Sequence, residues 1–346
     1  MSWRLLLPLS MLLMPLVVAA QNAAVANSGL LSDVTFTQYS PYASSAELAR
    51  RLVSPLNALR LQQQADAAHV RISEQPIDLE RERFALYVPA HAPASGYALL
   101  VFVPPWPQAE IPPRWIPALD RLGIILVSAA NSGNDANVLD RRDPLALLAA
   151  HNVMSRYRVD PGRVYIGGFS GGSRVALRLA LGYPDLFHGA LLDAGSDAIG
   201  EQIPVPPRDL LYRFQASTRV VYLTGGRDAF HEEADKRSRQ SLQAWCVFDV
   251  DNESMPWTGH ELAGGSSLEH ALESLAVHRP TEPGKLASCR ATMDSQLSQQ
   301  LDQAQGLIDR GEAGPARRLL DQIDRRYGGL AAPRSVELAQ RLSGVP

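Results

Sequence analysis

Continuous apolar runs recur along the middle of the chain and alternate with segments of helical length. A run of this kind is typical of a strand with both faces buried, because neither set of alternating side chains meets water. Strands that alternate with helices predict an α/β fold, a mostly parallel sheet covered by helices on both faces. The expected strands are 97–103 (YALLVFV), 123–128 (GIILVS), 163–166 (RVYI), 189–192 (GALL), 220–224 (VVYLT) and 245–250 (WCVFDV), and the expected helices lie near 113–121, 143–157, 171–183, 233–244 and 267–277.

The first 20 residues have the pattern of a secretory signal peptide. Arg4 is the only charge in the first 32 residues, and an apolar stretch from Leu5 to Val18 follows it and ends at small residues. Pro8 and Pro15 interrupt this stretch, which is shorter than the roughly 20 residues that span a bilayer, so cleavage is favoured over an uncleaved anchor. We therefore expect a periplasmic or secreted mature protein without stable membrane insertion.

Residues 21–67 are expected to form an N-terminal arm and a helix. Residues 21–44 are rich in Ser, Ala and Thr and predict an irregular arm, and leucines at helical spacing predict one helix over 46–64. The main domain, residues 68–290, is expected to begin with a hairpin-like pair of strands over 70–77 and 83–88.

Residues 291–346 show a different pattern, without strand-like runs. Apolar residues repeat at helical spacing in two stretches between Asp294 and Tyr327, with Gly311 to Pro315 between them, which predicts a C-terminal helical hairpin. The hairpin has the length of a single tetratricopeptide repeat, but one unit cannot form the stack that such arrays need. We expect it to pack on the main domain, and binding of a protein partner is the alternative.

Charge and composition argue against two kinds of partner. The chain has 346 residues and a formal charge of −3, without a run of Lys or Arg long enough to bind nucleic acid. Its histidines occur singly and no Cys-x-x-Cys pair is present, so the sequence predicts no metal site. Only two of the 33 basic residues are lysines, a bias typical of a GC-rich bacterial coding sequence.

The motif that carries chemistry is GFSGG at 168–172, which matches G-x-S-x-G. It directly follows the strand-like RVYIG and precedes the helix-forming SRVALRLAL, which is the context of a nucleophile elbow. Small residues around Ser170 allow a sharp turn that exposes its hydroxyl and points the Gly171 N–H toward an oxyanion. We interpret Ser170 as a nucleophile, and a structural Gly-rich turn is the alternative.

A serine hydroxyl needs a base that is oriented by a carboxylate, and in such sites the chain order is Ser, acid, His. Asp228 follows the VVYLT strand and a Gly pair, where an acid faces the elbow. Its structural alternative is a helix N-cap or Asx turn. Asp193 and Asp197, after the preceding strand, are its rivals.

His260 is the predicted base. It lies in the loop WTGHE beyond the last expected strand, with a helix following. His231 is only three residues from Asp228, too close to approach it from the opposite side, and His270 falls within the expected helix. We interpret both as surface or packing histidines.

The second oxyanion donor should come from the loop after the YALLVFV strand. Pro104 and Pro105 have no N–H, so Trp106 is the candidate. Nearby aromatic residues are candidates for an apolar acyl or aromatic pocket, with ordinary core and loop packing as the alternative: Trp106, Phe169, Trp115 and Trp257.

These residues resemble the α/β-hydrolase superfamily, and within it secreted esterases similar to polyhydroxybutyrate depolymerases and to feruloyl or acetylxylan esterases. The likeness spans about residues 68–278 and is most specific in the block from 160–161 (DP) through RVYIGGFSGG to 183–187 (YPDLF). Where those families usually carry His-Gly, this chain has Pro104-Pro105. The resemblance implies an α/β-hydrolase fold and ester hydrolysis without a cofactor by Ser170, Asp228 and His260.

The two cysteines, Cys246 and Cys289, are free to pair in an oxidising compartment, and two free buried thiols are the alternative.

Three functions are compatible with these patterns. The preferred one is a serine esterase that acts on a small or polymeric ester through an acyl-enzyme. The second is a non-catalytic binding or scaffold protein that uses the C-terminal helices. The third is a serine peptidase or acyltransferase, which a triad alone does not exclude.

Overall fold

The computed structural model describes residues 28–344, so the predicted signal peptide, residues 1–20, lies outside the described part of the chain. Its centre is one eight-stranded sheet with the order β1-β2-β4-β3-β5-β6-β7-β8. β2 runs antiparallel to both β1 and β4, and every other neighbouring pair is parallel. The strands are β1 (Gly29–Val34), β2 (Phe84–Val88), β3 (Tyr97–Val103), β4 (Ile124–Ala129), β5 (Val159–Phe169), β6 (Gly189–Asp193), β7 (Arg219–Gly225) and β8 (Val250–Met255).

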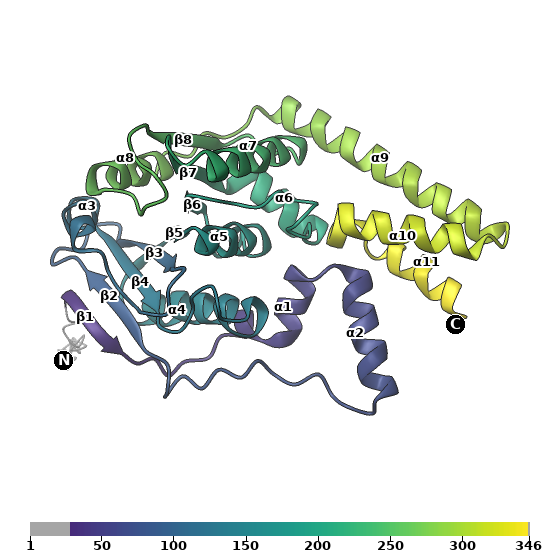
Figure 1. Cartoon of the computed structure of the whole chain (residues 1–346), viewed down its shortest axis with the longest axis horizontal. Helices are drawn as coiled ribbons and strands as arrows, with labels where there is room; N and C mark the ends of the chain where they lie inside the picture. Colours follow the sequence, from purple (N-terminus) through teal and green to yellow (C-terminus); the bar gives the residue numbers. More distant parts are fainter. Residues whose placement is uncertain (1–27, 345–346) are drawn as a thin grey trace, which may run out of the picture.

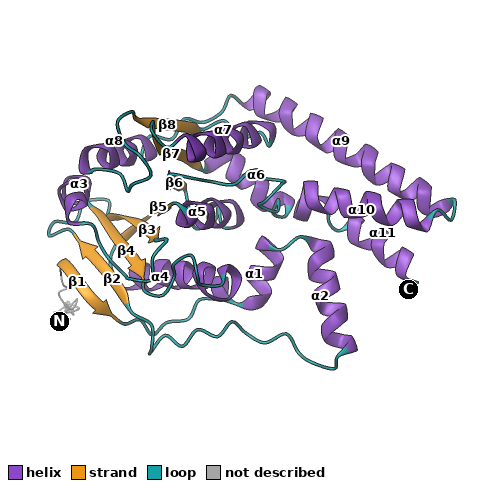
Figure 2. Ribbon diagram, in the orientation of Figure 1, coloured by secondary structure: helices purple, strands orange, loops and turns teal. Residues whose placement is uncertain are grey.

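Helices cover both faces of this sheet, and a helical extension lies beyond one end (Figures 1 and 2). The helices are α1 (Ser45–Leu52), α2 (Pro55–Ala67), α3 (Ile116–Leu122), α4 (Asp143–Arg156), α5 (Gly171–Gly182), α6 (Arg208–Ser217), α7 (Ala229–Ala244), α8 (Gly265–Leu275), α9 (Pro283–Asp309), α10 (Ala313–Tyr327) and α11 (Arg334–Ser343). Four short helical turns complete the set: η1 (Pro41–Ala43), η2 (Pro113–Trp115), η3 (Val138–Arg142) and η4 (Gly328–Ala331).

Alternate side chains of the central strands enter two separate cores. In β3, Leu99 and Val101 join a core with side chains of α4, α5, α6 and α7, whereas Leu100 and Phe102 join a second core with α3 and α8. Successive strand side chains point to opposite faces, so a continuous apolar run is needed when helices cover both. The predicted fold class, a mostly parallel sheet between two layers of helices, is confirmed.

The N-terminal expectations were wrong in three places. Part of the predicted arm forms β1, which pairs with β2 at the edge of the sheet. The single helix expected over 46–64 is two helices, because Pro55 has no N–H to continue α1 and instead starts α2. Residues 70–83 form no strand and run as an irregular segment with one turn, so the predicted hairpin is replaced by pairing of β2 with β1 and β4.

The last predicted strand was misplaced. The run 245–250 was expected to be a strand, but α7 extends to Ala244 and the strand β8 begins only at Val250. The apolar side chains of Trp245, Cys246 and Val247 are buried at the end of α7 instead. A short apolar run does not distinguish a strand from a buried helix end.

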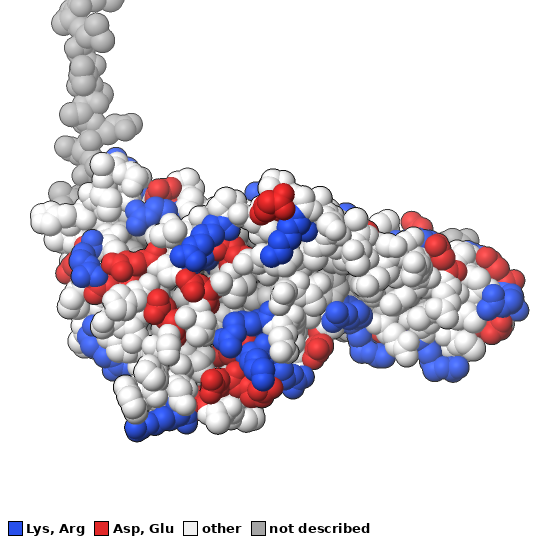
Figure 3. Space-filling model, turned by 90° about the horizontal axis from the view of Figure 1, so that it is seen from above, with Lys and Arg blue, Asp and Glu red and all other residues white. Residues whose placement is uncertain are grey.

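The C-terminal extension contains three helices, not the predicted hairpin of two. α9 begins at Pro283, ten residues before the expected start, and α11 follows η4. Asp324 of α10 accepts hydrogen bonds from Ser54 Oγ (2.6 Å) and from Leu56 N (3.0 Å), so α10 packs on the start of α2. On the face drawn in Figure 3, basic and acidic side chains are interspersed, with uncharged surface over much of this extension.

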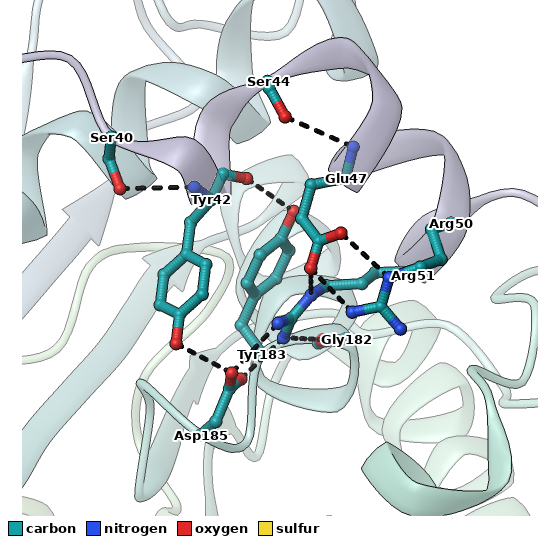
Figure 4. Close-up of polar contacts among 9 residues, drawn as sticks. All are labelled: Ser40, Tyr42, Ser44, Glu47, Arg50, Arg51, Gly182, Tyr183 and Asp185. Atoms are coloured by element: carbon teal, nitrogen blue, oxygen red, sulfur yellow. Dashed lines mark hydrogen bonds and ion pairs between the residues drawn. The ribbon is translucent and has the colours of Figure 1, made fainter.

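Arg51 joins α1 to the far end of α5 (Figure 4). Its Nη1 and Nη2 donate to the two carboxylate oxygens of Asp185 at 2.6 and 3.0 Å, and Nη1 also donates to Gly182 O. The guanidinium lies over the rings of Tyr42 and Tyr183, at 4.9 and 4.5 Å from their centroids. Because this side chain is buried and its charge is paired, the N-terminal helix is a fixed part of the main domain.

Between residues 28 and 344, every helix is either too short or too polar to cross a lipid bilayer.

The predicted pairing of Cys246 with Cys289 is confirmed as a disulfide, which joins the end of α7 to α9 across a sequence separation of 43. Closing a loop of that length stabilises a fold by about 4 kcal/mol in the chain-entropy model.

The double variant Cys246→Ala/Cys289→Ala is expected to lower the melting temperature and to retain the ester hydrolysis that the sequence predicts. Cys246 lies just beyond one end of α7 and Asp228 just before the other end. A helix of this length separates them by about 24 Å. Thermal unfolding and initial rates measured on one preparation check this, and an unchanged melting temperature would contradict it.

Candidate active site

Ser170 lies in a sharp turn between β5 and α5. Its backbone has φ 54° and ψ −121°, which is unusual for a residue with a side chain. Gly168 and Gly172 make the turn possible, since a Cβ on Gly168 would lie 2.3 Å from the Gly172 carbonyl carbon and one on Gly172 would lie 1.9 Å from Val103 O. The motif therefore has the strand, turn and helix of a nucleophile elbow, with the hydroxyl held at the carboxyl end of β5.

Three side chains from three separate loops meet in a hydrogen-bonded line. The hydroxyl of Ser170 donates to His260 Nε2 at 3.0 Å, and His260 Nδ1 donates to Asp228 Oδ2 at 2.7 Å. Ser170 follows β5, Asp228 follows β7 and His260 follows β8, so each lies beyond the carboxyl end of its strand. Parallel strands bring those ends to one edge of the sheet, which is where such folds place their sites.

Asp228 combines the two roles that the sequence left as alternatives. It is the N-cap of α7, accepting from His231 N, and it also accepts from His260. Burial disfavours its charged form, but the hydrogen bonds from His231 and His260 outweigh burial and hold the pKa of this carboxyl below its ordinary value. Asp228 therefore stays ionised at neutral pH.

The two rival acids, Asp193 and Asp197, have other partners than His260. Asp193 is fully buried at the end of β6, where one carboxylate oxygen accepts from Ala263 N at 2.9 Å. Asp197 forms an ion pair with Arg174 at 3.4 Å. His270 is an exposed residue of α8, as expected. Neither acid contacts His260.

His231 contacts Asp228, although its closeness in sequence was expected to prevent this. Its Nδ1 lies 2.8 and 2.9 Å from the two carboxylate oxygens of Asp228, and its ring stacks on His260 with 4.0 Å between centroids and 12° between planes. Asp228 is thus held by two parallel imidazoles. The sequence signal for this contact was the spacing of three residues between Asp228 and His231. The N-cap residue of a helix lies next to the residue three positions later.

His231→Ala is expected to lower kcat for the ester hydrolysis that the sequence predicts, about 10-fold and with little change in KM. A hydrogen bond to a charged group contributes about 1.5–3 kcal/mol, so its loss leaves Asp228 and the stacked His260 less well positioned. Steady-state kinetics across pH check this, with His270→Ala as the matched control. Wild-type kcat in His231→Ala would show that the second imidazole has only a packing role.

The backbone N–H groups of Gly171 and Trp106 are the two predicted oxyanion donors. Gly171 N is the first of α5, and Trp106 N lies in the loop after β3; neither finds an acceptor within residues 28–344. Arg142 braces this loop by donating from Nη2 to Pro104 O at 3.0 Å and from Nε to Ser132 O at 2.8 Å. The oxyanion hole formed by these two donors stays a prediction.

The aromatic candidates are not grouped into one pocket. Trp115 is 1% exposed and donates from its ring N–H to Ala263 O, so it is a core residue, contrary to expectation. Trp257 is 79% exposed on the surface. Phe169 is the one beside the site, stacked on His260 with 4.9 Å between centroids and 6.1 Å from the ring of Trp106.

A cavity of about 440 Å³ opens beside Ser170. Its walls come from α5, from η3 with the segment before it, and from the loop after β6, and the residues that line it are mostly polar. They are Asn134, Val138, Arg142, Ser170, Gly171, Arg174, Val175, Arg178, Asp197, Gln202 and Ile203. The sequence analysis singled out the serine and glycine here, but none of the three arginines.

Asp228, His231 and His260 are also the residues that could hold a metal ion, since one ligand atom from each lies within 4.8 Å of the others. One carboxylate and two imidazoles are a donor set suited to zinc. In this structure both Nδ1 atoms are already hydrogen bonded to the carboxylate, and His260 Nε2 faces Ser170. The geometry therefore fits a proton relay, because the nitrogen atoms that would bind a metal are already hydrogen bonded to Asp228 or Ser170.

The fold, and the strand, turn and helix around Ser170, resemble those of α/β-hydrolases. No family model and no curated protein matches the chain. Solved structures similar to it include a ferulic acid esterase, 14% identical with a TM-score of 0.44, where the match covers 72% of this chain and 99% of the other. An acetyl xylan esterase from Aspergillus awamori is 13% identical with a TM-score of 0.41, covering 56% and 94%. A protein from Bacteroides ovatus classed as a dipeptidyl aminopeptidase IV is 16% identical with a TM-score of 0.40, covering 56% of this chain and only 33% of the other.

Proposed function

We propose that this protein is a serine hydrolase that cleaves carboxylic esters through an acyl-enzyme. The observation that carries the proposal is the line of hydrogen bonds from Ser170 through His260 to Asp228. A hydroxyl is a weak nucleophile at neutral pH, and an imidazole whose other nitrogen is held by a carboxylate is the base that activates it.

In the first half of the reaction, Ser170 Oγ attacks the ester carbonyl as His260 Nε2 takes the hydroxyl proton. Negative charge develops on the carbonyl oxygen and is stabilised by the N–H groups of Gly171 and Trp106. Asp228 stabilises the imidazolium that forms. The intermediate then breaks its bond to the alcohol, which leaves with the proton from His260.

In the second half, water attacks the acyl group on Ser170 while His260 accepts a proton from the water. Collapse of the second intermediate releases the carboxylic acid and returns the proton to Ser170. The relay thus needs no group beyond those of the chain itself.

We further propose that the enzyme acts in the periplasm or outside the cell. The disulfide between Cys246 and Cys289 supports this, because such bonds persist mainly in oxidising compartments. The signal-like first 20 residues support it independently.

Rapid mixing with 4-nitrophenyl acetate tests the proposal. We expect a burst of one nitrophenolate per enzyme followed by slower turnover, which reports formation and hydrolysis of an acyl-enzyme. Peptide 4-nitroanilides and added alcohols as acyl acceptors, run in parallel, distinguish peptidase and acyltransferase activity. A chelator should leave the burst unchanged. Absence of any ester turnover would favour a non-catalytic binding protein.

A further inference from the structure

One face of α5 forms a wall of the cavity beside Ser170. Gly171, Arg174, Val175 and Arg178 all line the cavity, and their spacing places them on one side of the helix. At 1.5 Å per residue, Arg174 lies about 6 Å and Arg178 about 12 Å along the axis from Ser170. The cavity therefore leads from the serine hydroxyl past two guanidinium groups.

Arg142, at the end of η3, adds a third guanidinium to the lining of the cavity. It is only 4% exposed, yet it lines the cavity. Its Nε and Nη2 donate to backbone carbonyl groups, while Nη1 has no hydrogen-bond acceptor anywhere in residues 28–344. This Nη1 atom is reached by solvent in the cavity, so it is available to an anion that enters there.

The acidic groups nearby do not balance the three arginines. Asp197 is the one carboxylate that lines the cavity, and it pairs with Arg174 at 3.4 Å. Asp143 lies 3.3 Å from Arg178 and is fully buried, and neither of its carboxylate oxygens accepts a hydrogen bond from the described residues. Burial raises the pKa of Asp143 to about 7, so it is only partly ionised at neutral pH. The cavity keeps an excess of positive charge.

The position of the base indicates which part of an ester the cavity holds. The leaving alcohol must lie near His260 Nε2, because it takes its proton from that atom. His260 is not among the residues that line the cavity, whereas Ser170 and Gly171 are. The cavity is therefore on the side of the acyl group, which stays bound to Ser170 after the alcohol leaves.

We propose that this cavity binds a carboxylate at the far end of the acyl group, so that the preferred substrates are monoesters of dicarboxylic acids. The inference rests on the proposed ester hydrolysis and adds a substrate class to it. Arg174, Arg178 and Arg142 supply the cations, and a guanidinium matches a carboxylate with two parallel hydrogen bonds. An uncharged acyl chain of the same length would leave the excess positive charge of the cavity unbalanced.

Two isosteric esters test the proposal: mono(4-nitrophenyl) adipate, and 4-nitrophenyl 6-oxoheptanoate, in which a methyl ketone replaces the carboxylate. We expect the wild-type enzyme to show a kcat/KM at least about 10-fold higher for the adipate ester, the size expected for charged hydrogen bonds. Arg174→Gln and Arg174→Gln/Arg178→Gln should bring that ratio toward one. Arg318→Gln, an exposed change on α10, is the matched control and should keep the wild-type ratio.

Because the ratio compares two esters in one preparation, it does not depend on the fraction of folded enzyme. A wild-type ratio near one with both esters hydrolysed would overturn the carboxylate site and leave the esterase proposal standing. No hydrolysis of either ester, or equal hydrolysis by Ser170→Ala, would overturn the esterase proposal itself. Adipate should also raise the melting temperature of Ser170→Ala but not that of Ser170→Ala/Arg174→Gln, and an equal effect on both would refute the site independently of turnover.

Discussion

Replacement of Ser170 with Ala is expected to abolish turnover of short 4-nitrophenyl esters, with a loss of at least about 10⁴-fold, because loss of the nucleophile from a triad costs roughly 10⁶-fold in kcat in a measured case. The thermal transition should stay nearly unchanged, since Ala retains the Cβ and the change removes only a hydroxyl that faces the cavity. Initial rates and thermal unfolding on the same sample check both parts.

Ser173 provides the matched control. It lies in the first turn of α5 and is fully buried, and its one hydroxyl proton is shared between Gly168 O, 2.7 Å from Oγ, and Asp193 O, 2.8 Å from Oγ. Ser173→Ala should therefore lower the melting temperature, by the loss of about 1 kcal/mol for a hydrogen bond, while folded enzyme stays active. Full activity in Ser170→Ala together with an inactive Ser173→Ala would show that the nucleophile was assigned to the wrong serine.

Asp228→Asn is expected to lower kcat by about 10⁴-fold, as measured for the equivalent change in another triad. The substitution keeps the shape of the side chain and an oxygen that caps α7, so the helix should persist. What it removes is the charge that orients His260 and stabilises the imidazolium. Kinetics and circular dichroism on the same variant separate loss of catalysis from loss of structure.

Asp193→Asn tests whether the effect belongs to Asp228. Burial, only partly offset by the hydrogen bond from Ala263 N, raises the pKa of Asp193 to about 8, so this carboxyl is mostly neutral at pH 7 and Asn resembles it. Its pKa is raised on folding, so the wild type should lose stability relative to Asp193→Asn as pH rises from about 4 to about 8. If Asp193→Asn loses activity and Asp228→Asn retains more than a tenth, the acid has been assigned to the wrong strand.

The central strands could be predicted from sequence because both of their faces are buried. A run such as 97–103 has no polar alternation, which is the pattern that a strand between two helical layers requires. The edges of the fold were less predictable. β1 is half exposed and lacks a continuous apolar run, so the sequence did not indicate a strand here. Its partner residues in β2 lie 50 to 59 positions further along the chain.

The elbow was recognised because its chemistry is local in sequence, with strand, turn and helix contiguous around Ser170. The stacked imidazoles and the three arginines were not recognised, because their significance depends on tertiary packing. The significance of His231 depends on the stacking of its ring on that of His260. His260 follows β8, so only the fold brings the two rings together. Arg142 lies at the end of η3, and only the fold brings it to the same cavity as Arg174 and Arg178.

The most direct test of the central claim is reaction of the native protein with a fluorophosphonate, followed by peptide mass spectrometry. Such a reagent forms a covalent bond only with a serine activated by its base, so we expect one equivalent of label at Ser170 and its loss in Asp228→Asn. Labelling at another serine, or none in folded protein that carries the disulfide, would contradict the assignment of Ser170, His260 and Asp228 as a catalytic relay.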